Sequence, residues 1–211
     1  MNGAMPTVEQ ILTGLTEIAN TWWPVAVFWH LYFGVLAGAL LLCIRPSKRV
    51  IGIFLGVPFL SVSSIAWLSS NPFNGIVFAF LGIIVIFISA KLPRESVQIA
   101  PLWAVIPGII MFLFGWGYPH FLDTSSFLPY LYSAPTGIIP CPTLSIVIGS
   151  ALILDGLGSR ILSLMLGMSG ILFGITGVVQ LGVSIDVVLL GSIVILILAF
   201  VGEPGRKTNP V

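Results

Sequence analysis

Residues 50–90 read VIGIFLGVPFLSVSSIAWLSSNPFNGIVFAFLGIIVIFISA, without a single charged side chain. A hydrocarbon core about 30 Å thick requires ~20 apolar residues per spanning helix, so this stretch is long enough for two spans. Its central part SSNPFNG, residues 69–75, is rich in turn-forming residues. The stretch therefore predicts two membrane helices, at about residues 50–69 and 73–91, joined by a short turn.

The composition of the whole chain excludes a water-soluble globule. Hydrophobic residues make up 57% of the chain and charged residues 7%, and the mean hydropathy is +1.13, as is typical of an integral membrane protein. The net charge is +1 and the cations are scattered, so no nucleic-acid partner is expected. No basic segment followed by an apolar one precedes Trp22, so we expect no cleavable signal peptide. The expected partner is the lipid bilayer.

Charges and turn residues divide the rest of the chain into further apolar segments. The predicted spans are residues 21–44, 50–69, 73–91, 99–118, 137–154, 160–180 and 184–202. The expected fold is an all-α integral membrane protein with a single seven-transmembrane-helix bundle over residues 21–202. Residues 203–211 would follow as a short cytoplasmic tail, and residues 119–136 would form the only sizeable loop.

The distribution of charge predicts the orientation of this bundle, because cytoplasmic loops are enriched in Lys and Arg. The seven-span arrangement places every cation on one side: Arg45, Lys48, Arg49, Lys91, Arg94, Arg160, Arg206 and Lys207. The opposite side receives Glu9, Glu17, Asp123 and Asp186. We therefore expect the N-terminus outside and the C-terminus in the cytoplasm.

Residues 1–20 are expected to form a short amphipathic helix at the membrane interface. Apolar residues recur there at helical spacing: Val8, Ile11, Leu12, Leu15 and Ile18. Thr7 and Gln10 are spaced as a capping box before this helix. Its polar face, which carries Glu9, would face water, and the following Trp22 suits the level of the lipid headgroups. The segment is either an interfacial anchor or a lid over an outer cavity.

The polar residues of the predicted spans gather at their outer ends. Both histidines of the chain and one of its two cysteines belong to the outer half of the predicted bundle. Ionisable groups within a membrane generally face a cavity or a partner and mark functional sites. The candidate substrate-binding residues are His30, Tyr118, His120, Thr136, Cys141, Gln180 and Asp186. Several of them also have a structural interpretation, such as a packed histidine or an interfacial aromatic residue.

The segment SAPTGIIPCPTLS, residues 133–145, places a proline on each side of Cys141. If the fifth helix includes these prolines, their missing amide hydrogens leave backbone carbonyls free to bind a ligand. Cys141 and His120 would then be candidate ligands for a soft or borderline cation such as Cu(I) or Zn(II). Alternatively, the prolines occupy the first turn of the helix and Cys141 is a small apolar side chain. The spacing of the residues leaves both interpretations open.

The sequence shows no convincing catalytic constellation. GMSGILFGITG, residues 167–177, resembles the serine segment of rhomboid intramembrane proteases, but no histidine follows Ser169 to act as its base. Cys43 and Cys141 are expected at opposite ends of the bundle, too far apart for a disulfide. The last span contains no lysine for a retinal Schiff base. An enzyme is therefore not expected, and no cofactor is indicated.

Short motifs along most of the chain resemble one family of multi-pass membrane proteins. They are VEQIL, NTWWP, NPFNG, GWGYP and APTGIIPCPT, together with Asp186 before the last span. The family is a group of bacterial membrane proteins defined only as a domain of unknown function, with the signature YP followed by PTxxxPCPT. The resemblance implies a compact helical bundle in the bacterial inner membrane, without an assigned activity. This chain departs from the pattern at residues 67–70, WLSS, where a histidine-containing stretch is usual.

Two functional hypotheses follow. The first is a permease or receptor with an outward-facing polar site for a metal ion or a small polar solute, and it predicts that the candidate residues line one wet cavity. The second is an accessory or scaffold subunit of a larger membrane complex, without a ligand of its own. It predicts dispersed polar residues and helix faces open to a partner, including a second copy of the chain.

Overall fold

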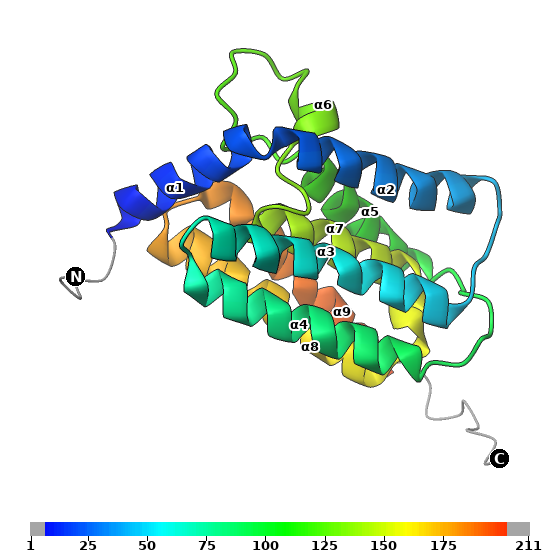
Figure 1. Ribbon diagram of the computed structural model, residues 1–211. Helices are drawn as coiled ribbons and strands as arrows, with labels where there is room; N and C mark the ends of the chain where they lie inside the picture. Colours follow the sequence, from blue (N-terminus) through cyan, green and yellow to red (C-terminus); the bar gives the residue numbers. More distant parts are fainter. Residues whose placement is uncertain (1–6, 202–211) are drawn as a thin grey trace.

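The computed structural model describes residues 7–201, and its regular elements are helices packed side by side (Figure 1). The longer helices are α1 (Val8–Thr21), α2 (Trp23–Leu41), α3 (Lys48–Leu68), α4 (Pro72–Ala90), α5 (Leu102–Trp116), α7 (Pro140–Ile153), α8 (Arg160–Ile175) and α9 (Ile193–Val201). The shorter elements are α6 (Tyr130–Ser133), the tight turn η1 (Asp155–Gly158), the π-helical turn η2 (Thr176–Gln180) and the 3₁₀ segment η3 (Ser184–Ser192). The predicted all-α fold is confirmed for the described residues. The predicted tail, residues 203–211, lies outside them.

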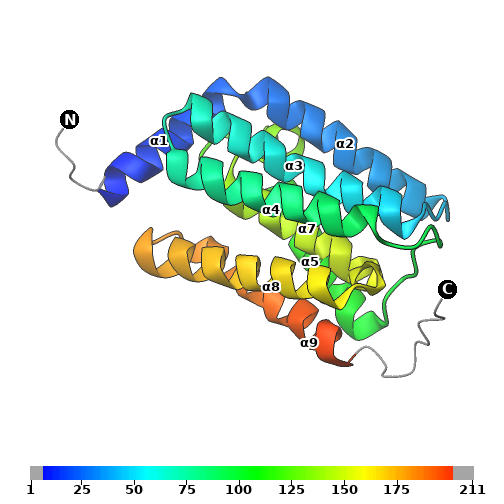
Figure 2. The ribbon, with the colours of Figure 1, turned by 60° about the horizontal axis from the view of Figure 1, so that its bottom comes forward.

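Within residues 7–201, four helices are long and apolar enough to cross a membrane. They are Trp23–Leu41, Lys48–Leu68, Pro72–Ala90 and the continuous stretch Arg160–Gln180. The other predicted spans contain shorter apolar helices, at Leu102–Trp116, Pro140–Ile153 and Ser184–Phe200. In the bundle, α2 lies at one side and α8 with α9 at the opposite side, with α3, α4, α5 and α7 between them (Figure 2). The fold is therefore a helical bundle compatible with a multi-pass membrane protein.

Helix α1 begins at the predicted capping box. The Gln10 backbone N–H donates to Thr7 Oγ1 at 3.3 Å, and the Thr7 backbone N–H donates to Gln10 Oε1 at 2.9 Å. Leu15 and Ile18 are buried, whereas the predicted polar face, with Glu9, is exposed. The amphipathic helix is thus confirmed over Val8–Thr21 as a helix with one buried face, and residues 1–6 of the predicted segment lie outside the described residues.

Helices α3 and α4 form the hairpin predicted from the charge-free stretch. Asn71 begins α4, since its Oδ1 accepts a 3.2 Å hydrogen bond from the Asn74 backbone N–H. Ser63 of α3 donates a 2.7 Å hydrogen bond to the Gly75 carbonyl of α4. Gly56 and Gly82 face side chains of the partner helix, where an added Cβ would be too close. These contacts hold α3 and α4 together as a hairpin.

Helix α7 lies at the centre of the bundle, and its residues from Pro140 to Leu152 are all buried. It packs against α5 through backbone contact. A Cβ added at Gly115 would lie 2.5 Å from the Pro142 carbonyl oxygen, and one added at Gly149 would lie 2.5 Å from the Phe112 backbone nitrogen. Close approach of two helices requires residues without side chains at such positions. The core of the fold is therefore a glycine-mediated helix pair enclosed by the other helices.

The described cations lie at one end of the helices, as the charge pattern predicts. They are Arg45, Lys48, Arg49, Lys91, Arg94 and Arg160, at the end of α2, the start of α3, the end of α4 and the start of α8. Lys48 Nζ forms a 2.8 Å ion pair with Glu95, and Arg49 Nε donates to the Leu92 carbonyl at 3.1 Å. These bonds join the first turn of α3 to the loop after α4. Arg206 and Lys207 lie outside the described residues.

Large apolar side chains are exposed on the outer faces of several helices. They include Phe28, Leu31 and Val35 of α2, Phe73, Ile76, Phe80, Ile83 and Phe87 of α4, Ile106, Ile110 and Leu113 of α5, Met168, Leu172 and Ile175 of α8, and Ile193, Ile197 and Phe200 of α9. On α4 they recur every three or four residues and so form one stripe. An apolar surface spread over so many helices is typical of a protein surrounded by lipid.

Candidate functional site

Polar side chains converge on the C-terminal end of α5, opposite the cationic end of the bundle. The last carbonyls of a helix have no partner within the helix, and inside an apolar bundle they need another donor. The Thr136 hydroxyl donates to the Gly115 carbonyl, and His30 Nε2 lies 2.8 Å from the Trp116 carbonyl oxygen. His30 and Thr136, both predicted as site residues, therefore satisfy the backbone at this helix end.

The His30 imidazole is held between two helices. It is buried, and its Nδ1 lies 2.8 Å from the Ala26 carbonyl oxygen of its own helix, α2. The Trp116 ring packs edge-on against the imidazole at a centroid distance of 5.0 Å. A neutral imidazole carries one N–H and donates to one of the two carbonyls at a time, whereas a protonated ring donates to both. His30 is thus a bridge between α2 and α5.

The most buried charged side chain on this side of the bundle is Asp186, at the start of η3. It is 1% exposed, and its Oδ1 accepts a 2.8 Å hydrogen bond from the hydroxyl of Tyr118, which is fully buried. The Cys141 thiol lies close enough to the same carboxyl group to interact with it. Tyr118, Cys141 and Asp186 therefore form one buried cluster, drawn from the end of α5, the first turn of α7 and η3.

Gly177 makes room for the Asp186 carboxyl group. It lies in the π-helical turn η2 at the end of α8, and a Cβ at this position would overlap Asp186 Oδ2. The Val183 backbone N–H donates to the Gly177 carbonyl at 2.9 Å, and the Asp186 backbone N–H donates to the Val183 carbonyl at 3.0 Å. π-Helical turns inside helices are frequent at functional sites. Here the turn allows the backbone at Gly177 to contact a carboxyl group directly.

The proline-rich segment enters the bundle before α7 begins. Ile139 is extended, with φ −118° and ψ 147°, and the helix begins at Pro140. The two prolines therefore lie in the first turn, where amide hydrogens are unpaired in any helix. The fifth span, predicted to begin at residue 137, is helical only from Pro140, and of the two interpretations left open by the sequence the one in which the prolines interrupt the helix is wrong. The first-turn interpretation describes this segment.

Two residues that are not among the predicted site residues fix the segment before α7. The Thr143 hydroxyl donates to the Ile139 carbonyl at 2.6 Å and accepts from the Gly137 backbone N–H at 2.8 Å. Gly137 has φ +75°, and its Cα lies against the Trp29 indole, where a Cβ would overlap the ring. A glycine is required here both for its backbone conformation and for space.

The structure brings most, but not all, of the candidate residues together. Tyr118, Cys141 and Asp186 are in contact, and His30 and Thr136 bind the neighbouring carbonyls of α5. His120 is exposed, and its ring centroid lies 6.5 Å from that of Tyr118, at the outer edge of the cluster. Gln180 is exposed at the end of η2. The buried candidate residues therefore bind one another and the backbone. In the described part of the chain they do not line one wet cavity.

The described residues show no ready metal centre. Among residues 7–201, no group of three or more His, Cys, Asp or Glu side chains is placed to hold a metal ion. Of the two predicted ligands, Cys141 is buried and His120 is exposed. A Cu(I) or Zn(II) site at these two residues therefore has no structural support.

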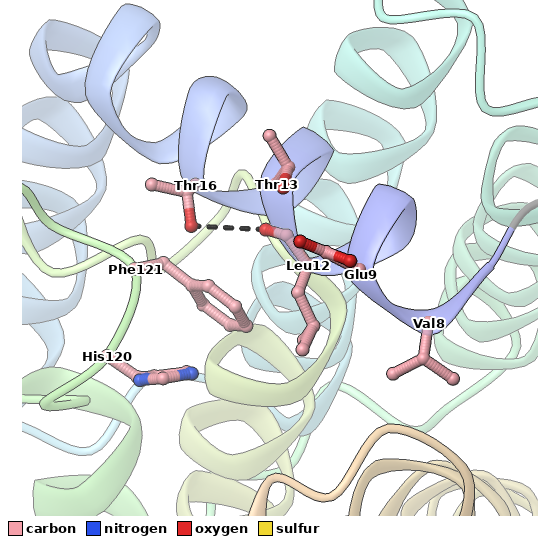
Figure 3. A pocket seen from close by; sticks show the side chains of 7 residues that line it. All are labelled: Val8, Glu9, Leu12, Thr13, Thr16, His120 and Phe121. Carbon is pink, nitrogen blue, oxygen red and sulfur yellow. Dashed lines mark hydrogen bonds between the residues drawn. The ribbon is translucent and has the colours of Figure 1, made fainter.

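A groove lies next to this cluster, between α1 and the loop that follows α5 (Figure 3). Its volume is about 540 Å³, and it is lined by Val8, Glu9, Leu12, Thr13, Thr16, His120 and Phe121. The Phe121 ring lies parallel to the buried Tyr118 ring, with centroids 6.0 Å apart. The groove thus borders the outer edge of the Asp186 cluster.

No known protein family, curated protein or solved structure matches this chain. The fold and the site define the described residues as an all-helical bundle with membrane-compatible helices and, at one end, a buried polar cluster around Asp186.

Proposed function

We propose that this protein is a multi-pass permease or receptor of the bacterial inner membrane, with a site for a small cationic or polar solute at its outer end. The observation that carries the proposal is the buried carboxyl group of Asp186, bonded to Tyr118 inside an apolar bundle. Ionisable groups within membrane segments are costly and generally mark a solute or ion pathway. A carboxyl group favours a cationic solute.

The proposed orientation is the seven-span topology with an outer N-terminus. The described cations lie at one end of the bundle, which supports a cytoplasmic location for that end. The end of α5, η3 and α1 lie at the opposite end. α5 and α7 are short for a 30 Å core, but α7 is enclosed by protein and does not need to match the lipid thickness.

A solute approaching from outside would pass His120, the exposed member of the cluster. It would then meet the Asp186 carboxyl group, whose Oδ1 is occupied by the Tyr118 hydroxyl. Binding would therefore replace or share this hydrogen bond. The Gly177 backbone leaves no space on the other side of the carboxyl group, so access from that side is blocked.

The second candidate function is an accessory or scaffold subunit of a larger membrane complex. The observation that favours it is that the buried polar groups bind one another and the backbone carbonyls at the C-terminal end of α5. A network satisfied in this way stabilises a fold without any ligand. The exposed apolar stripes of α4 and α8 would then contact other subunits.

A stability screen of the purified protein in nanodiscs separates the two functions. Unfolding temperatures would be measured with Na⁺, ammonium, choline, Zn(II) and Cu(I), for the wild type, Asp186→Asn and the control Asp123→Asn. Asp123 is exposed at the same end of the bundle. Its hydrogen bond to Asn20 comes from its backbone N–H, so replacing the side chain leaves this bond in place. A ligand at 100 times its dissociation constant stabilises the folded state by about 2.7 kcal/mol.

The permease or receptor proposal expects one cation to raise the unfolding temperature of the wild type and of Asp123→Asn, with the increase lost in Asp186→Asn. If no cation stabilises the wild type, or if Asp186→Asn responds equally, the buried pair is structural and the scaffold function takes precedence.

A further inference from the structure

The groove between α1 and the loop after α5 has a mostly apolar lining with polar groups on opposite walls. Val8 and Leu12 contribute hydrocarbon from α1, and the Phe121 ring of the loop lies next to the Leu12 side chain (Figure 3). Its volume of about 540 Å³ is within the range of small-molecule sites, about 300–1,000 Å³. An amphipathic ligand matches this lining better than a small ion does.

The polar groups of the groove differ in kind between the two walls. Glu9 lies in the first turn of α1 and supplies a carboxylate, whereas His120 lies on the loop and supplies an imidazole N–H. The Thr16 hydroxyl is occupied, because it donates to the Leu12 carbonyl at 3.1 Å. A carboxylate binds an ammonium group, and an N–H donor binds a phosphate oxygen. The groove is therefore complementary to a ligand that carries both groups.

The two walls are held at a fixed separation by Asn20, at the end of α1. Its side-chain amide donates to the Phe121 carbonyl at 2.9 Å, and its Oδ1 accepts from the Asp123 backbone N–H at 3.0 Å. Phe121 itself has φ +75°, an uncommon conformation for a residue with a side chain. These contacts preorganise the groove, which lowers the entropic cost of binding.

The position of the groove indicates which ligand carries these groups. α1 is amphipathic, with a buried apolar face and an exposed polar face, and such helices lie at the boundary between headgroups and acyl chains. The exposed Trp23, which follows directly, suits the same level. A phospholipid with a primary ammonium group presents its ammonium, phosphate and acyl chains at this depth.

We propose that the α1 groove binds one phosphatidylethanolamine molecule of the surrounding membrane. Its ammonium group contacts the Glu9 carboxylate, its phosphate accepts a hydrogen bond from His120, and the start of an acyl chain lies against Val8 and Leu12. The lipid holds α1 against the loop next to the Asp186 cluster. This site shares His120 with the solute path proposed above, but it does not use the Asp186 carboxyl group.

The test measures lipid selectivity of the full-length protein by native mass spectrometry. The protein would be reconstituted with phosphatidylethanolamine and phosphatidylcholine in equal amounts, and the retained lipid identified after gentle release. The variants are Glu9→Gln and His120→Leu, with Glu17→Gln as the matched control. Glu17 is exposed on the same helix but does not line the groove, and Glu9→Gln leaves the capping box between Thr7 and Gln10 intact.

The proposal expects the wild type to retain roughly tenfold more phosphatidylethanolamine than phosphatidylcholine. This ratio corresponds to the free energy that one charge-assisted hydrogen bond contributes to binding. Glu9→Gln should lose this preference and Glu17→Gln should keep it, while His120→Leu should retain less of both lipids. Equal retention of the two lipids by the wild type, or an unchanged preference in Glu9→Gln, overturns the proposal. Asp186→Asn should retain the lipid normally, so failure of the solute site leaves this result unaffected.

Discussion

The Tyr118 hydroxyl donates a 2.8 Å hydrogen bond to Asp186 Oδ1, and this bond joins two positions 68 residues apart in the chain. It connects the end of α5 to the start of η3, and neither side chain is more than 1% exposed. A buried carboxyl group that loses its donor is left unsatisfied, which is more costly than the bond itself is stabilising. Loss of this hydrogen bond should therefore lower the stability of the protein more than loss of any other contact in the cluster.

Replacing Tyr118 by Phe should lower the free energy of unfolding by about 1–3 kcal/mol, because the ring still packs but Asp186 loses a hydrogen bond. The intrinsic tryptophan fluorescence of the purified protein, followed during heating, measures the change. Tyr132→Phe is the matched control, since Tyr132 is 49% exposed. Equal unfolding temperatures for Tyr118→Phe and the wild type would show that the bond contributes nothing.

Replacing Gly177 by Ala should displace Asp186, because the new methyl group would overlap its carboxyl group. We expect a loss of about 1–3 kcal/mol, as for other overpacked sites. Gly14→Ala is the control, since no atom lies within 4 Å of the added Cβ. Alanine is a better helix former than glycine, by about 0.5–1 kcal/mol, so Gly14→Ala should stabilise the protein slightly. Chemical denaturation of both variants compares the two effects, and a harmless Gly177→Ala would contradict the close approach.

The contact between α5 and α7 should not tolerate a side chain at Gly115. An added Cβ would lie 2.5 Å from both the Pro142 carbonyl oxygen and the Ile146 backbone nitrogen. Because both are backbone atoms, the helices must separate, and we expect Gly115→Ala to fold poorly or to lose more than about 2 kcal/mol.

The neighbouring Gly117 provides the control for this variant. Its added Cβ would meet only the Leu113 carbonyl oxygen, at 3.7 Å. Gly117→Ala should therefore elute as a single species in size-exclusion chromatography with near-normal yield. Similar yields for the two variants would argue against a backbone contact at Gly115.

The two cysteines should differ in reactivity and report the orientation. Cys43 is exposed at the cationic end, whereas Cys141 is buried in the first turn of α7. A membrane-impermeant maleimide should label Cys43 in inside-out vesicles but not in intact cells. Cys43→Ser should remain unlabelled until the protein is denatured. Labelling of Cys43 in intact cells would place the cationic end outside and reverse the proposed topology.

The features that the sequence predicted best depend on neighbouring residues. Asn71 and Pro72 start α4 within the predicted turn, and Thr7 with Gln10 forms the predicted capping box. Such signals act within one or two helical turns, so a linear pattern contains all the information needed. The helix start at Pro140 is an instructive exception, because both interpretations of its prolines were consistent with the local sequence.

The site was only partly predictable, because its contacts join distant segments. Asp186, Tyr118 and Cys141 could be selected as polar residues near one end of the bundle. The partner of His30, however, is the backbone carbonyl of Trp116, which no side-chain pattern reveals. The one available signal for Gly177 was the recurrence of glycines along α8, since Gly170 and Gly174 also lie against η3. Glycines at such spacing indicate close packing but do not identify the group that they contact.

The complete enclosure of α7 constrains the order in which the bundle can be assembled. This helix emerges from the ribosome after α5 but before α8, η3 and α9, the later elements that pack against it. The hydroxyl groups of its buried Ser145 and Ser150 do not depend on these later elements for hydrogen bonds. Ser145 already has a partner at that stage, the Met111 carbonyl of α5, and Ser150 bonds to Ile146 within its own helix. The nascent chain can therefore hold α7 beside α5 as a preassembled pair, around which the C-terminal helices close as translation ends.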